Sequence, residues 1–79
     1  MATEVRLPQW GMGMTEGEIL VWLKQVGDRV EIGEALAEIE AAKVEQELES
    51  PIAGTLLEQV AAEGDIVPIR EVVAIIDED

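Results

Sequence analysis

The chain contains the same pattern twice, and this internal repeat limits the folds open to it more than any other feature. Residues 17–40 align with residues 54–77 at an offset of 37 without a gap, and nine of these 24 positions are identical. The shared frame reads G-x-[IL]-L, then G-D-x-V-x-I-x-E, then A-x-I. Two copies are too few for a stacked repeat architecture. We therefore expect a single domain, residues 1–79, built from two similar halves.

Each copy has the pattern of β structure. Short apolar runs bounded by glycine and turn residues are typical of strands, and the chain has four of them: EILVWLK, EALAEIE, TLLEQV and EVVAIID. The segments VGDRV and EGDIV place Gly-Asp between strands, which is typical of tight turns. No apolar stripe with the helical period persists for ten residues. The alternation in EILVWLK is imperfect, which predicts a bulge or burial on both faces. An all-β fold of two sheets related by a pseudo-two-fold axis follows.

The offset also predicts where Lys43 lies. It falls in the connection between the halves, and adding 37 to its number gives a position just beyond the last residue. The counterpart of the Lys43 turn is therefore the gap between the two chain ends. If the axis exists, Lys43 lies at one pole and both termini lie at the other.

Lys43 stands in a run of acids that begins at Glu38 and ends at Glu49, and it is one of two lysines in the chain. A lysine at a hairpin tip is commonly a solvated side chain or a guard against strand pairing. An amine on a rigid pole also suits covalent modification, which would remove its charge. A catalytic lysine would need burial or a cationic neighbour to lower its pKa, and the neighbours here are carboxylates.

Composition excludes several classes of function. The chain has no cysteine and no histidine, so a disulfide scaffold, a thiol nucleophile and a thiolate metal site are excluded, and the commonest general base and commonest metal ligand are missing. A formal charge of −13 argues against nucleic acid and favours a basic partner surface. No apolar run approaches the roughly 20 residues of a membrane span, and the start MATEVRLP lacks the features of a signal peptide. We expect a soluble protein of the cytoplasm, or of the mitochondrial matrix in a eukaryote.

The sequence resembles the lipoyl domain of the dihydrolipoyl acyltransferase component of 2-oxo acid dehydrogenase complexes. The resemblance covers about residues 4–77, and the segments that carry it are LPQW, GMGMTEG, W-x-x-x-x-G-D-x-V, G-E-x-L-x-E-I-E and SPIAGTLLEQVAAEGDIV. It implies a flattened barrel-sandwich of two antiparallel sheets. It also implies lipoate in amide linkage on Lys43, on a turn opposite the termini, with Ala42 and Val44 as turn neighbours.

The resemblance further implies a set of partners. A lipoate ligase or a lipoyl/octanoyl transferase would modify Lys43. A thiamine-dependent dehydrogenase (E1) would load the arm, an acyltransferase core would unload it, and dihydrolipoamide dehydrogenase would reoxidise it. The domain itself would be a monomeric carrier without catalytic residues, because the cofactor supplies the chemistry.

The residues on either side of Lys43 depart from the patterns of both the lipoyl and the biotin carrier domains, so alternatives for the cofactor stay open. The family usually has Asp before the modified lysine, and this chain has Ala42. The related biotin carrier domain has methionine on both sides of its lysine, where this chain has Ala42 and Val44. Lipoate is favoured over biotin because of the lipoyl-type first half, and an unmodified structural module is the third reading.

The loop QWGMGMTEG holds candidates for partner recognition. The resemblance implies that this loop lies near the Lys43 turn, and Trp10 and Met12 are expected to form an apolar recognition patch there, with Glu40 and Glu45 as acidic flanks that attract a basic partner. In the alternative reading, Trp10 and Met14 cover one end of the core. Glycines of this loop are expected to permit turn geometry. The remaining expectations are structural: a solvated face for Glu45, Glu47 and Glu49, a core position for Trp22, and turn positions for Asp28 and Asp65.

Overall fold

The computed structural model describes residues 1–78, and every regular element in this range is a strand. The eight strands are β1 (Ala2–Arg6), β2 (Glu16–Trp22), β3 (Arg29–Val30), β4 (Ala35–Ala41), β5 (Val44–Glu49), β6 (Gly54–Gln59), β7 (Ile66–Pro68) and β8 (Val72–Glu78). The four strands expected from the sequence are present, with bounds shifted by one or two residues. Within residues 1–78 there is no helix long and apolar enough to cross a membrane.

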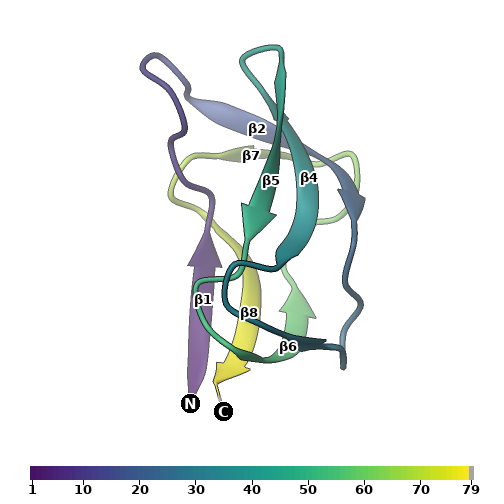
Figure 1. Ribbon diagram of the computed structural model, residues 1–79. Helices are drawn as coiled ribbons and strands as arrows, with labels where there is room; N and C mark the ends of the chain where they lie inside the picture. The colour runs from purple at the N-terminus through teal and green to yellow at the C-terminus, as the bar shows by residue number, and fades with distance from the viewer. Residues whose placement is uncertain (79) are drawn as a thin grey trace.

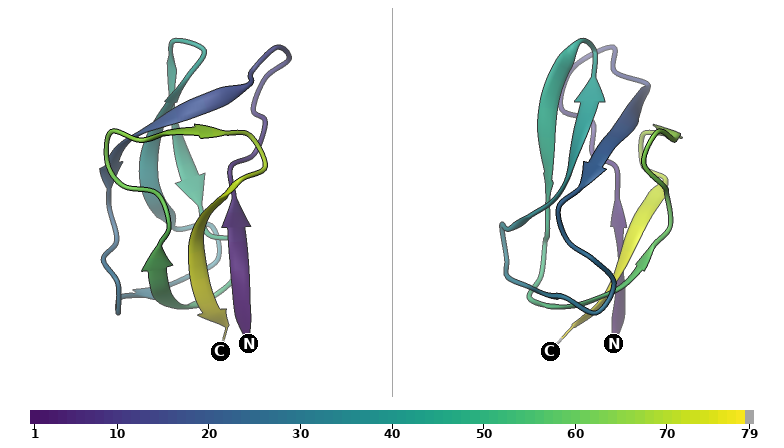
Figure 2. Two further views of the ribbon diagram at one scale, coloured as in Figure 1. Left: turned by 180° about the vertical axis from the view of Figure 1, so that it is seen from behind. Right: turned by 90° about the vertical axis from the view of Figure 1, so that its right-hand side faces the viewer.

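The strands form two four-stranded antiparallel sheets with the orders β1-β8-β6-β3 and β5-β4-β2-β7. Figures 1 and 2 show the arrangement of the two sheets from three sides, and the buried hydrophobic side chains form one core cluster. Alternate strand residues point inward, so the core takes one apolar residue from every second position. The bulky apolar side chains with no exposed surface are Leu7, Ile19, Val30, Leu36, Ile39, Leu56, Val73 and Ile76. The expected all-β fold, a flattened barrel-sandwich, is confirmed.

The short strand of each half belongs to the sheet of the other half. β3 pairs with β6, and β7 pairs with β2. The Gly-Asp segments lie in tight turns between strands, as predicted, and these turns carry the chain from one sheet to the other. In both turns the aspartate carboxylate accepts a hydrogen bond of 2.9 Å, from the amide of Gln25 to Asp28 and from that of Ala62 to Asp65. The structural role expected for both aspartates is confirmed.

The two-fold relation extends to the irregularities of the strands. The β2–β4 register shifts between Ile19 and Val21, and the β6–β8 register shifts between Leu56 and Glu58, 37 residues further on. The bulge predicted in EILVWLK is therefore present, and it has a counterpart in the second half. A bulge bends and twists its strand, which lets each sheet curve around the shared core.

Lys43 and the chain ends lie at opposite ends of the molecule. The β4–β5 turn forms one end, and both termini lie together at the other (Figures 1 and 2). The described chain is elongated along one axis, with extents of 35 × 20 × 17 Å. The Glu78 amide donates to the Met1 carbonyl oxygen at 2.8 Å, which joins the two ends. The prediction from the repeat, that Lys43 and the chain ends lie at opposite poles, is confirmed.

Candidate functional site

A two-residue turn holds Lys43 at the tip of the β4–β5 hairpin. Ala41 and Val44 are paired across the ladder, which leaves only Ala42 and Lys43 in the loop. Both have positive φ, 53° and 68°, and two such residues are the mark of a type I′ turn, whose twist matches that of the flanking strands. Glycine and asparagine are the usual residues there. Alanine and lysine each cost about 1 kcal/mol or more in this conformation, so the paired strands must hold the turn in place.

The Lys43 side chain is exposed and free. It makes no hydrogen bond or ion pair with any residue of the described range 1–78. The chain's other lysine, Lys24, lies 2.7 Å from the Glu34 carboxylate. This hydrogen bond raises the pKa of Lys24, and the same contact lowers the pKa of Glu34. The exposed position of Lys43 also removes the burial that a catalytic lysine would need.

On one side of the turn the surroundings are acidic. An open hollow of about 230 Å³ is lined by Lys43 itself and by the carboxylates of Glu16, Glu18 and Glu40. Glu40 lies directly opposite Glu18 on β2 and directly opposite Glu45 on β5. Like charges that face each other across strands repel. The two residues expected to attract a basic partner, Glu40 and Glu45, are thus neighbours beside the turn and both are exposed.

On the other side of the turn the surroundings are uncharged. An open hollow of about 180 Å³ lies between Trp10 and Met14 on one wall and Ala41, Val44 and Gln46 on the other. Sequence reasoning did not find this hollow, because it depends on the β1–β2 loop folding against the β4–β5 hairpin. Only the resemblance to lipoyl domains indicated that Trp10 lies close to the turn.

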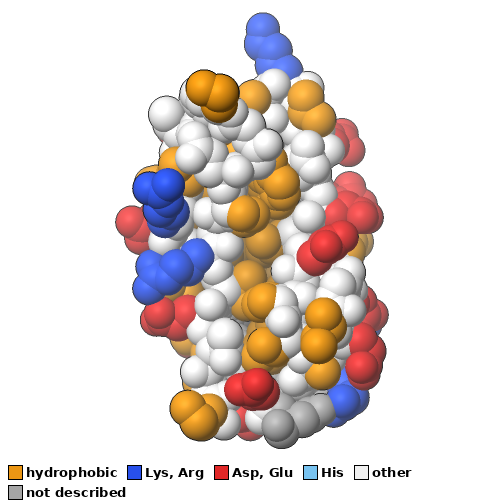
Figure 3. Space-filling model, turned by 60° about the vertical axis from the view of Figure 1, so that its left-hand side comes forward, with side chains coloured by type: hydrophobic (Ala, Val, Ile, Leu, Met, Phe, Trp, Pro, Cys, Tyr) orange, Lys and Arg blue, Asp and Glu red, His pale blue; other side chains and the backbone are white. Residues whose placement is uncertain are grey.

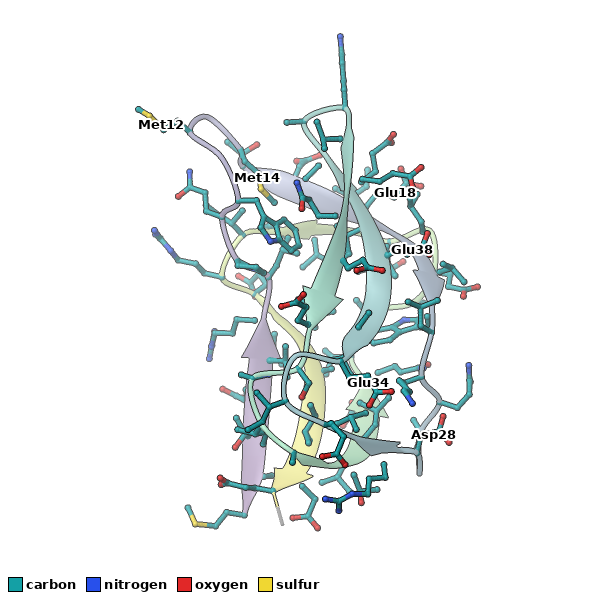
Figure 4. The ribbon with its side chains drawn as sticks, viewed as in Figure 1. Met12, Met14, Glu18, Asp28, Glu34 and Glu38 are labelled. Carbon is teal, nitrogen blue, oxygen red and sulfur yellow. The ribbon has the colours of Figure 1, made fainter. Side chains whose placement is uncertain are left out.

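The large apolar side chains of the loop, Trp10, Met12 and Met14, have different environments. Met12 is fully exposed and points away from the body of the protein, whereas Met14 points inward and is buried (Figure 4). Trp10 is half-buried and packs against the core. Trp10 and Met14 thus cover one end of the core, as the alternative reading expects, and recognition of a partner by Trp10 and Met12 stays a prediction. Gly13 has a φ of 83°, as its expected turn role requires, but Gly11 has no positive φ.

The acids of β5 alternate along its outer face. Glu45, Glu47 and Glu49 are all exposed, while Leu48 between them is buried. Among residues 1–78 no group of three or more acidic side chains is arranged to hold a metal ion. Trp22 is 6% exposed and donates its indole N–H to the Ala61 carbonyl at 2.9 Å, which confirms its place in the core.

A second surface lies between the outer edges of β1 and β5. This groove of about 560 Å³ has Val5 and Leu48 in its floor, Trp10 and Pro51 along its length, and Arg6 among its charged rim residues. Figure 3 shows hydrophobic side chains down the middle of this side of the molecule, with basic and acidic groups together on the left and mostly acidic groups on the right. The groove could not be predicted from the sequence, because only the topology shows that β1 and β5 are edge strands of different sheets.

These observations define a class of protein. One amine stands free on a rigid turn, the chain ends lie at the far pole, and the turn carries neither histidine nor cysteine as a base or nucleophile. A domain of this kind presents a point of attachment for a covalently bound group. The family model described as "Biotin-requiring enzyme", which covers biotin and lipoyl attachment, matches residues 3–76, so the chain belongs to this family.

Individual relatives narrow the assignment. The chain is 48% identical over 73 residues, or 92% of its length, to the dihydrolipoyllysine-residue acetyltransferase component of the pyruvate dehydrogenase complex of Corynebacterium glutamicum. It is 47% identical over 86% of its length to the corresponding component of the acetoin cleaving system of Bacillus subtilis. It is also 47% identical over 95% of its length to the dihydrolipoyllysine-residue succinyltransferase component of the 2-oxoglutarate dehydrogenase complex of Staphylococcus saprophyticus.

The chain spans only 11%, 17% and 18% of these three relatives. All three are named for dihydrolipoyllysine, so they support the lipoyl type of carrier over the biotin type. The resemblance drawn from the sequence is confirmed, and the domain is a lipoyl carrier domain of the kind found in acyltransferase components.

Proposed function

We propose that the Lys43 Nζ carries lipoate in amide linkage and that the domain presents this arm to the enzymes of a 2-oxo acid or acetoin dehydrogenase complex. The observation that carries the proposal is the free Lys43 amine on the strained two-residue turn, at the pole opposite the chain ends. An amide linkage requires only an accessible primary amine, and Lys43 supplies one without breaking an existing contact. The attached group would supply a disulfide that accepts electrons and an acyl group and then releases both.

Residues of the domain itself position the Lys43 amine. The two-residue turn of Ala42 and Lys43 places the lysine beyond the paired ends of β4 and β5, at the pole opposite the termini. Because the termini lie together at the other end, a linker attached there leaves the lysine pole uncovered. A tether of this kind keeps the arm at high local concentration near successive active sites.

The partners follow from the relatives and from the charge of the domain. We propose that a lipoate ligase or a lipoyl/octanoyl transferase modifies Lys43. A thiamine-dependent dehydrogenase (E1), an acyltransferase core and dihydrolipoamide dehydrogenase then act on the arm. The exposed carboxylates of Glu40 and Glu45 beside the turn favour basic surfaces on these partners. The net charge of −13 opposes self-association, so the domain is proposed to act as a monomer of the cytoplasm, or of the matrix in a eukaryote.

Intact-mass measurement tests the proposal. The domain is expressed in a host with active lipoate and biotin ligases, with each cofactor supplied in turn. We expect one lipoyl adduct, its loss in Lys43→Arg and its retention in Lys24→Arg, which is the matched control at the other lysine. A biotin adduct would show the biotin carrier instead. An unmodified chain under both conditions would show a structural module, and an adduct that survives in Lys43→Arg would move the site elsewhere.

A further inference from the structure

The two hollows beside the Lys43 turn differ in the chemistry of their lining. This difference decides which of them is suited to bind a lipoyl group attached to Lys43. One is lined by three acidic residues, Glu16, Glu18 and Glu40, together with Lys43 and the apolar Ile66. The other contains no charged side chain and is lined by Trp10, Met14, Ala41, Val44 and Gln46. A lipoyl group in amide linkage is uncharged and consists of an alkyl chain and a sulfur ring. Apolar groups gain by leaving water for an apolar surface, whereas carboxylates keep their hydration. The uncharged hollow is therefore the one that suits the arm.

We propose that this uncharged hollow is a resting seat for the dithiolane end of the arm on Lys43. The proposal rests on the proposed lipoylation and goes beyond it, because it gives the domain a binding site for its own prosthetic group. The arm is then docked against the β1–β2 loop between encounters with the partner enzymes.

The lining of the seat fits a sulfur ring. Trp10 is half-buried, so part of its ring remains available, and the buried Met14 also lines the hollow. Aromatic rings make favourable contacts with soft, polarizable sulfur. The volume of about 180 Å³ compares with the roughly 150 Å³ cavity in which an apolar protein interior binds benzene. The seat is large enough for a small ring.

The position of the seat makes docking reversible. Ala42, which precedes Lys43 in the turn, is itself part of the wall, so an arm that folds back over Val44 reaches the seat without any movement of the backbone. Attachment keeps the ring at high local concentration there. The hollow is open to solvent on one side, so burial is partial and the arm can leave for a partner.

Nuclear magnetic resonance of the lipoylated domain tests the proposal. Protons of the dithiolane ring are expected to shift away from their positions in free lipoamide, because the Trp10 ring lies against them. Nuclear Overhauser contacts from these protons to the methyl groups of Met14 and Val44 are also expected. Trp10→Leu should return the dithiolane signals to their free positions. Met12→Ala, in the same loop but fully exposed and outside the hollow, should leave them shifted.

The outcomes separate the seat from the lipoylation itself. A mass spectrum without an adduct overturns the proposed function before the seat is tested. An adduct whose dithiolane signals match free lipoamide overturns the seat alone. If Trp10→Leu does not fold, a comparison of the backbone amide chemical shifts of the unmodified and lipoylated wild-type domains tests the seat instead. Changes at Trp10, Met14 and Val44 support the seat, and changes confined to Glu16, Glu18 and Glu40 overturn it.

Discussion

Arg70 occupies in the second half of the chain the left-handed backbone position that Gly33 occupies in the first. Their φ angles are 72° and 83°. Their amides make the equivalent hydrogen bond, from Gly33 to the Ser50 carbonyl at 2.8 Å and from Arg70 to the Leu7 carbonyl at 2.7 Å. The two-fold fold therefore imposes one conformation on both sites, although only one of them has the residue that adopts it without strain.

Replacing Arg70 by glycine is expected to stabilise the domain. The substitution relieves a left-handed conformation that costs a side-chain-bearing residue about 1 kcal/mol. The Arg70 carbonyl that accepts from Arg6 is retained because it belongs to the backbone. For a domain of this size each kcal/mol raises Tm by roughly 4–8 °C, which thermal unfolding measures. The reciprocal control, Gly33→Arg, introduces the strain in open space and should lower Tm by a similar amount. A Tm that falls in Arg70→Gly would contradict the argument.

Ala42→Gly is expected to stabilise the lysine turn for the same reason. Ala42 has a φ of 53° in a two-residue turn, where glycine is among the preferred residues. The free energy of unfolding in urea should rise by about 1 kcal/mol. Ala62→Gly makes the same chemical change in an exposed turn without positive φ, and it should instead lose up to about 1 kcal/mol. Equal effects of the two substitutions would show that the turn holds no strain.

The buried glycines of the two halves should differ in their tolerance of alanine. A Cβ on Gly54 would overlap the carbonyl oxygen of Asp77, which is backbone and cannot move aside. A Cβ on the equivalent Gly17 would lie 2.8 Å from Ile39 Cγ2, a side-chain atom. We expect Gly54→Ala to cost about 4 kcal/mol or more and Gly17→Ala about 1–3 kcal/mol. Urea titrations that gave the two variants the same midpoint would contradict this ranking.

The repeat allowed much of this architecture to be predicted from the sequence. An offset that maps Ile19 onto Leu56 and Gly17 onto Gly54 requires equivalent strands, and it places the Lys43 turn opposite the termini without knowledge of any relative. The imperfect alternation near Leu20 indicated the bulge, because a bulge changes which face a residue occupies.

The exchange of β3 and β7 between sheets could not be predicted in this way. Gly-Asp is favourable in any tight turn, so it does not reveal whether the next strand pairs with the previous one. The strands concerned are short, Arg29–Val30 and Ile66–Pro68, and too few residues alternate in them to define a face. The hollow at Trp10 was missed for a related reason, since loop packing against a hairpin leaves no period in the sequence.

The ion pair of Lys24 and Glu34 should contribute stability in a defined pH window. The Lys24 ammonium, 2.7 Å away, lowers the pKa of the Glu34 carboxyl, and the Glu31 amide adds to this shift. A lowered carboxyl pKa gives stability above its unfolded value, about 4.3, that is lost as the pH falls through the folded pKa. The raised pKa of Lys24 gives stability that is complete below about 10.4 and lost as the pH rises through its folded pKa.

Titration of the Glu34 carboxyl carbon by nuclear magnetic resonance measures this coupling. In Lys24→Gln the Glu34 pKa should rise toward its ordinary value. In Lys43→Gln, which removes the other lysine beyond the far end of β4, it should stay where it is in the wild type. A Glu34 pKa unaffected by Lys24→Gln would show that the contact is absent in solution.

The carboxylates of Glu18, Glu40 and Glu45 beside the lysine turn repel one another and should lower the stability of the domain. Added salt, or neutralisation of the middle residue Glu40, should therefore raise that stability. Glu40 lies between Glu18 and Glu45 on neighbouring strands, and each directly opposed like-charge pair costs about 0.2–1 kcal/mol. Glu40→Gln removes both pairs and is expected to raise the midpoint of urea unfolding, with a gain that shrinks as added salt screens the charges. The matched control is Glu58→Gln, which neutralises an exposed strand glutamate opposite the apolar Ile75. That control makes the net charge less negative by the same single unit, so an equal gain in both variants would assign the effect to total charge and rule out repulsion among the three carboxylates. The gain is instead expected to be larger for Glu40, which would mean that the acidic flank of the turn is kept at a cost to stability, consistent with a surface that attracts basic partners.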